Sequence, residues 1–489
     1  MRHNIIFETK QGNHYLYAEG MQSCILLHPE LKKQMETANN PDKEGNTETD
    51  DYYRQKYQFL LSHQALENTE VSFITQPDPE EVKIKLANLR QLLLEVTDGC
   101  NLKCHYCGYG EMYNNYDPRH SRLLSFEKVK KVIDYMEELW NSPYNHSHNN
   151  VVDISFYGGE PLLNMELIRK TIDYVENKDV SQLQFTYRMT TNGMLLDRYM
   201  DILVEKNFNL LISLDGDEHG NSYRETKGGN NSFRQVYGNI LALKEKYPDY
   251  YEKQVNFNAV LHDRNTYEDI YLFIKHNLNK SPLVSELNDS GIREDKREEF
   301  RKMFKSTYEE QKKAYENCEE ISENDLFTKA ENVQFRSMLH GHTGNTYKTL
   351  NDLLKNKNEI LHMPSGTCMA FYKKFFLTVN GKVLPCEKIG QRYPLGSVDE
   401  EKVKIDFNEI SSLYKEMYKP LLKLCKQCYH QSNCAQCVFN IFEKSKAGKL
   451  FCPTFVNKRS MQAYLSENVS YIEENPEVYE EMINKKVLS

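Results

Sequence analysis

The sequence lacks the features of a membrane, secreted or nucleic-acid-binding protein. No run of about 18 apolar residues occurs, so no membrane span is expected. The first residues, 1–8, have neither a long apolar core nor a small-residue cleavage site and are not those of a signal peptide. The net charge is −9, and an acidic balance argues against a broad nucleic-acid surface. We therefore expect a cytoplasmic protein with no membrane and no nucleic-acid partner.

Cysteine, by contrast, is plentiful. The chain has 489 residues, which is long for one domain, and its hydrophobic fraction of 39% is sufficient for packed cores. It contains 12 cysteines, and in a cytosolic protein these are more typical of metal ligands than of disulfides. Most of them fall into two groups, so two regions of metal chemistry are predicted.

The first group follows an apolar strand predicted over 90–96. Cys100, Cys104 and Cys107 lie on the loop after it. A cuboidal iron–sulfur cluster usually takes four thiolates, so three would leave one iron open to a substrate. A zinc site or reactive thiols are the alternatives, although zinc sites more often combine two short Cys-x-x-Cys hooks.

This spacing, with Tyr106 before the last cysteine, resembles the signature of the radical S-adenosylmethionine (radical SAM) enzymes. In that family S-adenosyl-L-methionine chelates the open iron through its amino and carboxylate groups. The resemblance implies a 4Fe-4S cluster on the three cysteines, S-adenosyl-L-methionine as a second cofactor, and Tyr106 near that cofactor.

Strands and helices alternate between 89 and 287. This alternation predicts parallel strands with crossover helices, and six such units would form an incomplete α/β barrel. Barrel sites lie at the C-terminal ends of the strands, where the cysteine loop also begins. The predicted strands are 90–96, 151–156, 183–190, 209–214, 254–261 and 282–287.

Several residues at these strand ends match family positions that contact S-adenosylmethionine. The second strand ends in Gly-Gly-Glu, which in the family contacts the amino group of the cofactor, and Arg224 could pair with its carboxylate. Each motif alone is also typical of a simple turn or, for Arg224, of a solvated loop. The resemblance implies cofactor contacts by Gly158, Gly159, Glu160, Asn192, Ser213, Asp215 and Arg224.

The N-terminal segment reads as a β-hairpin, a third short strand and two helices. Turn residues separate alternating runs at 5–8 and 14–17, and helical patterns begin at His28-Pro29 and span 52–66. The unit is similar to the winged-helix leader-peptide recognition domain of some peptide-maturing radical SAM enzymes. It could bind an extended peptide at an exposed strand edge, or it could be a structural cap.

The second cysteine group lies in the C-terminal part, where Asn380-Gly381 predicts a hairpin. Two zinc ribbons are one interpretation. The pattern also resembles the SPASM domain of radical SAM enzymes, including Gly381 five positions before Cys386. One departure is that Cys434 and Cys437 have two residues between them rather than three.

The SPASM resemblance implies two auxiliary 4Fe-4S clusters. Auxiliary cluster II would be bound by Cys425, Cys428, Cys434 and Cys452. Auxiliary cluster I would be bound by Cys368, Cys386 and Cys437. The latter set lacks a fourth cysteine, so we predict an open iron there, or a distant ligand such as Cys318.

Together these patterns predict a partial (βα)6 radical SAM barrel between an N-terminal winged-helix-like unit and a small cysteine-rich SPASM domain. The predicted segments are 1–85 (leader-peptide recognition), 88–288 (barrel), 289–362 (helical linker or insertion), 363–455 (SPASM) and 456–489 (helical tail).

The resemblance implies a peptide maturase that generates a 5′-deoxyadenosyl radical and installs a thioether crosslink in a ribosomally made precursor peptide. Its partners would be that precursor, with its leader, and a flavodoxin- or ferredoxin-type electron donor. Alternatives are sulfatase maturation, peptide epimerisation, carbon–carbon crosslinking and a non-catalytic iron–sulfur or zinc scaffold. Sulfatase-maturing enzymes often carry an acid after the cysteine equivalent to Cys386, which makes Glu387 a candidate general base or a turn glutamate.

Overall fold

The fold comes from a computed structural model. It describes residues 4–19, 21–37, 48–63, 66, 72–146, 150–180, 183–322, 329–343, 363–366, 368–431, 434–445 and 450–487. None of the helices in these ranges is long and apolar enough to cross a membrane.

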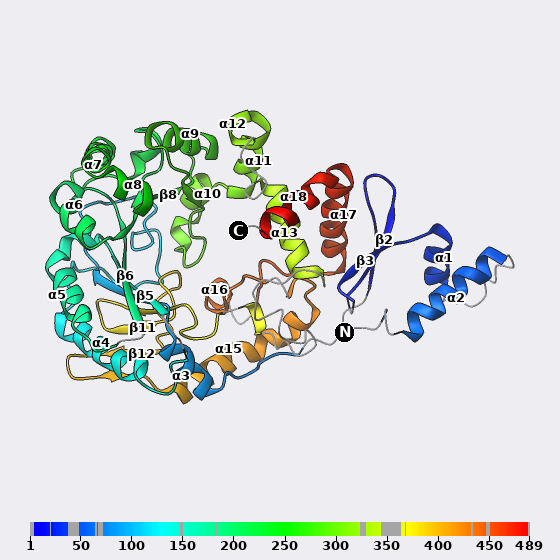
Figure 1. Ribbon diagram of the computed structural model, residues 1–489, viewed down its shortest axis with the longest axis horizontal. Helices are drawn as coiled ribbons and strands as arrows, with labels where there is room; N and C mark the ends of the chain where they lie inside the picture. The colour runs from blue at the N-terminus through cyan, green and yellow to red at the C-terminus, as the bar shows by residue number, and fades with distance from the viewer. Residues whose placement is uncertain are drawn as a thin grey trace.

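Six parallel strands form the predicted partial barrel, in chain order. They are β4 (Gln91–Thr97), β5 (Asn150–Gly158), β6 (Leu183–Thr191), β7 (Asn209–Ser213), β8 (Val255–Val260) and β9 (Leu283–Ser285). Their outer face is covered by α4 (Phe126–Trp140), α5 (Met165–Glu176), α6 (Leu196–Glu205), α7 (Phe233–Lys246), α8 (Pro248–Gln254) and α9 (Tyr267–Leu278) (Figure 1). The predicted α/β barrel is therefore confirmed, with strand ends within three residues of those expected.

The barrel helices form where the sequence has both a cap and an apolar stripe. Ser125 precedes α4, and its side chain accepts a hydrogen bond from the Lys128 amide. The buried side chains of α4 recur at helical spacing and pack on the sheet, so burial of this face holds the helix in place. They are Val129, Val132, Ile133, Met136, Leu139 and Trp140.

The C-terminal cysteine-rich region extends the barrel sheet. The predicted hairpin forms from β10 (Lys374–Leu377) and β11 (Lys382–Leu384). Gly381 in its turn has φ +83°, and a Cβ there would lie 2.2 Å from the Val398 carbonyl oxygen, so glycine is required. Unexpectedly, β10 pairs in parallel with β4, and β12 (Gly396–Val398) and β13 (Val403–Lys404) complete a 10-stranded sheet. This pairing joins the two cysteine regions through one sheet.

Two helices frame the second cysteine group. The long helix α15 (Phe407–Gln427) ends beside Cys428 and packs on α3 (Pro79–Ala87). The shorter helix α16 (Val438–Lys444) begins directly after Cys437. Because α3 also contacts α4, this helix links the barrel to the cysteine-rich region.

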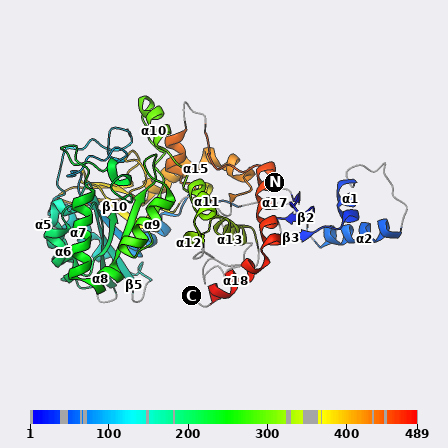
Figure 2. The same ribbon diagram turned by 90° about the horizontal axis from the view of Figure 1, so that it is seen from above.

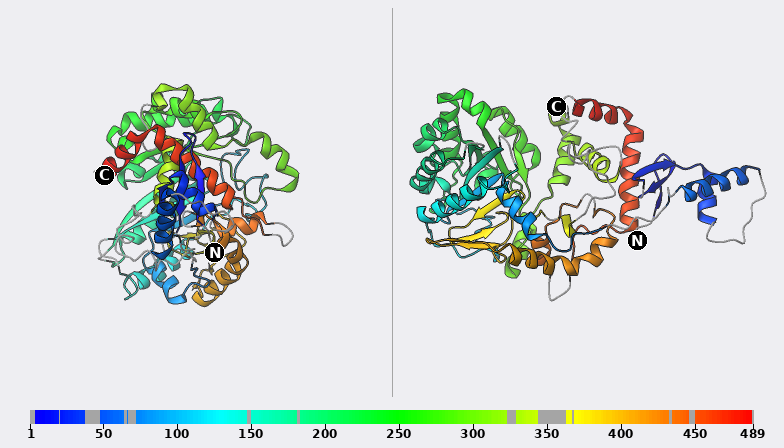
Figure 3. Two further views of the ribbon diagram at one scale, coloured as in Figure 1. Left: turned by 90° about the vertical axis from the view of Figure 1, so that its right-hand side faces the viewer. Right: turned by 60° about the horizontal axis from the view of Figure 1, so that its bottom comes forward.

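The N-terminal unit lies at the end of the molecule opposite the barrel (Figures 1 and 2). It contains the antiparallel sheet β1 (Ile5–Glu8), β2 (His14–Ala18) and β3 (Ser23–Leu26), followed by α1 (Pro29–Thr37) and α2 (Glu48–Ser62). The hairpin and both predicted helices are therefore present. The sheet packs on α17 (Lys458–Glu474) through β1 (Figure 3), and the Tyr15 hydroxyl of β2 donates a hydrogen bond to Glu473 of α17 at 2.7 Å.

Both segments predicted to be helical contain more than one helix. The linker forms α10 (Arg297–Met303), which packs Phe300 and Met303 with Tyr106 and Tyr223, and α11 (Thr307–Asn317). The helical tail is divided between α17 and α18 (Pro476–Val487), since proline disfavours helix at the residue before it. The linker also forms α12 (Glu319–Ser322) and α13 (Ala330–His342), and 344–362 lies outside the described residues.

Candidate active site

The first cysteine loop is fastened to the end of β4. The Asp98 carboxylate accepts hydrogen bonds from the amides of His120 (3.1 Å) and Arg122 (2.6 Å). Within the loop the Cys107 amide donates to the Cys104 carbonyl at 3.2 Å. These bonds attach the loop to the end of β4 and form a tight turn between Cys104 and Cys107.

The three sulfurs lie close enough to influence one another electrostatically. Burial raises the pKa of Cys104 to about 12, and the neighbouring thiolates of Cys107 and Cys100 raise it as well. The pKa of Cys100 is also raised by burial, although the Leu102 amide donates to its sulfur at 3.4 Å. Without a metal these pKa values keep the groups as neutral thiols, whereas a positively charged iron–sulfur core would stabilise them as thiolate ligands.

The Gly-Gly of the second strand end touches the cysteine loop itself. The Gly159 amide donates to the Thr97 carbonyl and the Glu160 amide to the Gly99 carbonyl, both at 2.9 Å. A Cβ on Gly159 would lie 1.9 Å from the Gly99 oxygen. Glycine is therefore needed here for close approach of two backbones, whereas the sequence suggested approach to a ligand.

Glu160 is a fully buried carboxylate. It accepts hydrogen bonds from the Leu162 amide (3.1 Å), the Thr191 hydroxyl (2.7 Å) and the Asn192 amide (2.8 Å). Burial raises its pKa to about 7 despite these donors. A cationic ammonium group would stabilise the charged form, so the predicted contact with the amino group of the cofactor fits this environment.

Asn192 connects the third strand to the cysteine loop. Its side-chain nitrogen, Nδ2, donates to Asn101 Oδ1 at 2.7 Å and lies 3.6 Å from Cys100 Sγ. Ser213 ends β7 opposite Asn258 of β8, at the same edge of the sheet. The structure therefore places both predicted residues at the barrel mouth, and their contacts with the cofactor stay predictions.

Arg224 has a partner that the sequence did not suggest. It makes a bidentate ion pair with the buried carboxylate of Asp215, with both N···O distances 2.9 Å. Asp215 also accepts from the Tyr106 hydroxyl, and the fully buried His262 lies 3.7 Å from it. Burial raises the pKa of Asp215, but the positive charge of Arg224 outweighs burial and lowers that pKa to about 2. The three predicted residues therefore form one network with His262, which sequence reasoning missed.

Four C-terminal cysteines line one small cavity. They are the set predicted for auxiliary cluster II, namely Cys425, Cys428, Cys434 and Cys452. The Val456 amide donates to Cys428 Sγ at 3.4 Å, and burial, followed by the neighbouring thiolates, raises the pKa of Cys434 to about 11. A shared cavity with backbone donors to sulfur suits a thiolate-bound cluster.

The remaining C-terminal cysteines occupy two places. Cys368 and Cys437 lie near each other beside α15, where both influence the hydroxyl of Tyr414. Cys386 follows β11, and its sulfur is 3.4 Å from Glu387 Oε2. Cys318 packs instead with Tyr267, Tyr315 and Ile321.

Cys386 and Glu387 face the first cysteine loop across Tyr116. Burial, with smaller contributions from Cys386, Cys107 and Glu387, raises the pKa of Tyr116 to about 12.

 Lys374 donates to Glu387 Oε1 at 2.6 Å, and although burial raises the pKa of Glu387, the charge of Lys374 lowers it overall. An ionised carboxylate therefore lies between the two cysteine regions.

The chemistry of the donor set fits iron–sulfur clusters. Four cysteines line one cavity, and thiolates are the ligands by which proteins hold such clusters. Among the described residues no three His, Cys, Asp or Glu side chains form a site for a single metal ion.

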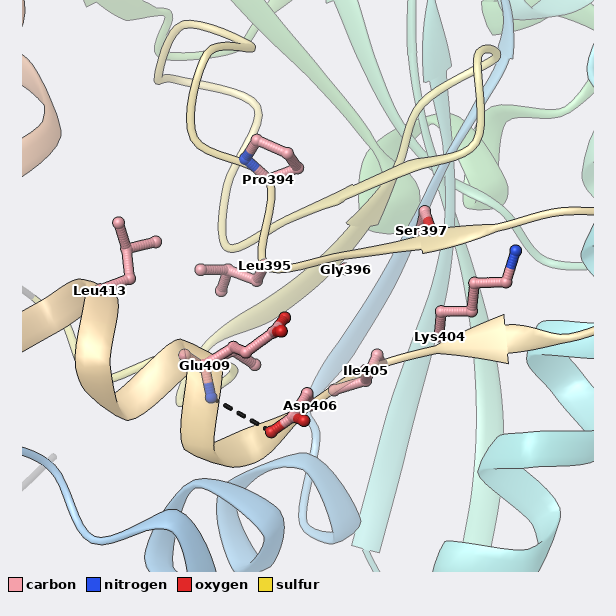
Figure 4. Close-up of a pocket in the computed structure, with 10 residues that line it drawn as sticks. Pro394, Leu395, Gly396, Ser397, Lys404, Ile405, Asp406, Glu409 and Leu413 are labelled. Atoms are coloured by element: carbon pink, nitrogen blue, oxygen red, sulfur yellow. Dashed lines mark hydrogen bonds between the residues drawn. The ribbon is translucent and has the colours of Figure 1, made fainter.

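A separate surface hollow lies between β12, β13 and the start of α15 (Figure 4). Lys404, Asp406 and Glu409 line it together with Leu395 and Leu413, and no cysteine does. It is not part of the candidate active site.

Two family profiles match the chain. The Radical SAM superfamily matches residues 94–276, and SPASM, an iron–sulfur cluster-binding domain, matches residues 368–437. The first covers the barrel through α9, and the second covers the cysteines from Cys368 to Cys437.

Curated relatives match either part or most of the chain. The uncharacterized protein MJ0907 of Methanocaldococcus jannaschii is 34% identical over 32% of this chain and 49% of its own length. The radical SAM cyclopropyl synthase TigE of Paramaledivibacter caminithermalis is 26% identical over 41% of this chain and 42% of its own length. The chain thus spans about half the length of these two or less. A cysteine-type anaerobic sulfatase-maturating enzyme of Clostridium novyi is 24% identical over 79% of this chain and 96% of its own length.

A solved structure shares the fold. The structure of anSMEcpe with bound AdoMet and Cp18Cys peptide has a TM-score of 0.53 at 18% identity, and the match covers 81% of this chain and 99% of that chain. At this identity the similarity concerns the fold alone.

Proposed function

We propose that this chain, which matches the Radical SAM superfamily and the SPASM domain, is a radical SAM enzyme that installs a thioether crosslink in a ribosomally made precursor peptide. Its cofactors are 4Fe-4S clusters and S-adenosyl-L-methionine. These matches favour an enzyme over the non-catalytic iron–sulfur or zinc scaffold. The identity of the substrate and of the bond formed is what we propose.

The proposal assigns the cofactor-binding residues as follows. Cys100, Cys104 and Cys107 hold the cluster that binds S-adenosylmethionine, with Glu160 near its amino group. When bound, these groups supply a 5′-deoxyadenosyl radical that takes a hydrogen atom from a substrate carbon, and the SPASM clusters supply an acceptor for the remaining electron. The protein's own residues must hold the peptide, exclude water and accept a proton.

The position of Cys386 and Glu387 carries the proposal. Both influence Tyr116, which also lies near Cys107, so this SPASM segment faces the barrel mouth. Cys386 is a predicted ligand of auxiliary cluster I. The other cysteines assigned to that cluster are Cys368 and Cys437, so the set lacks a fourth cysteine. An incompletely ligated cluster facing the radical site is suited to bind the sulfur of a substrate cysteine.

Glu387 would accept the proton of the substrate thiol. Thioether formation removes a hydrogen atom from carbon, and a proton and an electron from the thiol. Glu387 is kept ionised by Lys374, and its Oε2 already lies 3.4 Å from the Cys386 sulfur. A second thiol near that sulfur would therefore be within reach of a general base.

The N-terminal unit would bind the leader of the precursor. In the described sheet β3 is an edge strand, with Leu26 60% exposed. A hollow beside it is lined by Leu27, Leu31, Lys32 and Lys56, among others. A peptide could add to this edge as a strand and place side chains in the hollow. A flavodoxin- or ferredoxin-type protein would supply electrons.

Sulfatase maturation is the second candidate. The acid after Cys386 is present as Glu387, and the chain is similar over 79% of its length to a cysteine-type anaerobic sulfatase-maturating enzyme. In this reaction Glu387 would again take a proton from the substrate cysteine. Epimerisation and carbon–carbon crosslinking have no comparable support from named residues.

Mass spectrometry tests the proposal. Short peptides encoded beside the gene would be co-produced with the enzyme under anaerobic, iron-replete conditions. Thioether formation predicts loss of two hydrogen atoms per modified cysteine, which then resists alkylation. Unchanged peptides, together with conversion of cysteine to formylglycine in a sulfatase-motif peptide, would favour the second candidate.

A further inference from the structure

One buried side-chain amide lines the cavity of the four C-terminal cysteines without a partner for its oxygen. Gln431 is 5% exposed, and its Oε1 accepts no hydrogen bond within the described part of the chain. The same side chain forms part of the wall of the cavity that Cys425, Cys428, Cys434 and Cys452 line. Burying a polar group without a hydrogen bond destabilises a protein, so this amide is expected to find its partner inside the cavity.

The backbone on both sides of Gln431 is held by hydrogen bonds. The Cys434 amide donates to the Gln431 carbonyl at 3.2 Å, which closes a turn between these two residues. Two positions before Gln431, the Tyr429 amide donates to the Val456 carbonyl at 3.0 Å, and Tyr429 packs in a buried core with side chains of α13 and α17. Gln431 is therefore fixed next to a predicted cluster ligand.

Other polar groups of this region already lie next to cysteine sulfur. The Val456 amide donates to Cys428 Sγ at 3.4 Å, and Thr454 Oγ1 is 3.8 Å from Cys452 Sγ. Gln431 differs from them because its buried oxygen is still unpaired. A carboxamide has two N–H donors beside its oxygen, and a half-turn about its last side-chain bond exchanges the two atoms. The side chain can therefore present a donor to the cavity.

We propose that the Gln431 amide donates a hydrogen bond to a sulfur of auxiliary cluster II and thereby raises the reduction potential of that cluster. Hydrogen bonds to the sulfurs are among the factors that set this potential, because a donor stabilises the more negative, reduced form. The assignment rests on the part of the proposed function that places this cluster on the four cysteines of the cavity. A higher potential makes the cluster a better acceptor for the one electron that thioether formation leaves behind.

Gln431→Met tests the hydrogen bond. Methionine has a similar length and volume but no N–H donor. In the reconstituted full-length enzyme, one cluster should keep its iron while its midpoint potential falls by about 59 mV, which corresponds to a tenfold change in the equilibrium constant for one electron. EPR spectra recorded at controlled potentials measure this shift. The affected signal should be the one that is lost when Cys425 and Cys428 are both replaced by Ala, and the other clusters should keep their potentials.

Gln427→Met is the matched control. Gln427 lies between Cys425 and Cys428 at the end of α15, but its side chain is exposed and does not line the cavity. The same substitution at this position should leave every potential unchanged. An unchanged potential in Gln431→Met would overturn the inference, and so would an equal fall in both variants.

The outcomes separate this inference from the proposed function. If replacing Cys425 and Cys428 by Ala removes neither iron nor an EPR signal, no cluster is bound in this cavity, and the assignment of auxiliary cluster II fails together with the inference. If that cluster is present and Gln431→Met keeps its potential, the amide binds only water and the inference alone fails. Neither result depends on which peptide the enzyme modifies.

A measurement on the wild-type enzyme covers a variant that does not take up the cluster. The enzyme is produced with ¹⁵N in the side-chain amides of glutamine alone, and the reduced auxiliary cluster II is studied by pulsed EPR. A ¹⁵N coupling to the cluster is expected, because Gln431 is the one glutamine among the described residues that line this cavity. Absence of this coupling would overturn the inference.

Discussion

The two cysteine regions are built in different ways. Cys100, Cys104 and Cys107 lie on one short loop whose backbone is fixed by Asp98 and by the Gly-Gly turn after β5. The C-terminal cysteines come from a hairpin, two helix ends and the loops between them, and they meet only in the folded chain. A local loop presents ligands by its own conformation, whereas the SPASM cysteines depend on how separate elements pack.

The same contrast applies to the charges around them. The first region has a buried ionic network in which Arg224 neutralises Asp215 beside Tyr106. At the second, Lys374 and Glu387 form a less buried pair that faces the first region. The ion pair of the first region is therefore almost fully buried, whereas that of the second region is partly exposed.

Replacing Cys100, Cys104 and Cys107 together by Ala should have the largest effect. Without these thiolates no cluster can bind S-adenosylmethionine, so 5′-deoxyadenosine formation should be abolished. The measurement is chromatography of the nucleoside products after anaerobic reduction, with iron analysis alongside. Unchanged 5′-deoxyadenosine formation in this triple variant would disprove the assignment of the first region as the radical site.

Replacing Cys425 and Cys428 by Ala should separate the two regions. The cavity lined by four cysteines loses half of its thiolates, so peptide modification should fall below detection. Cleavage of S-adenosylmethionine should continue, because the barrel loop is intact. Equal loss of both activities would show that the two regions are not independent, and a melting curve tells such coupling from unfolding.

Asp215→Asn should destabilise the barrel mouth. It removes the partner of the buried Arg224, and breaking a buried ion pair in this way costs about 3–5 kcal/mol. Denaturant unfolding measures the change. Lys404→Ala, which breaks an exposed pair with Asp399, is the control and should change stability by less than about 1 kcal/mol. Equal changes in the free energy of unfolding for the two variants would mean that the buried network adds no more stability than the exposed pair.

Glu160 should give the smallest effect, a pH dependence of stability. Its pKa is raised to about 7 in the folded protein, so its contribution is fully present below the ordinary carboxyl pKa and is lost as pH rises through about 7. Two to three pKa units correspond to about 3 kcal/mol. Unfolding of the cofactor-free protein from pH 5 to 8 should show this fall, and Glu160→Gln should flatten it. An identical slope in the variant would assign the effect to other groups.

Local patterns in the sequence were sufficient for the barrel and for the cofactor class. Strand and helix periods depend on which face each residue buries, and Cys100, Cys104 and Cys107 are joined by a loop too short to rearrange freely. The hairpin at Gly381 was predictable for the same reason, since the turn requires positive φ. The set of cysteines that share one cavity also agrees with the grouping implied by the SPASM resemblance.

Only the tertiary structure decided which partners these residues find. The pairing of β10 with β4 depends on backbone hydrogen bonds between strands far apart in the chain, for which the sequence carries no local signal. Arg224 pairs with Asp215 because both are buried together, and a loop arginine in a sequence does not reveal its burial. Spacing within a loop is a property of the sequence, but a contact between distant segments is a property of the packed fold.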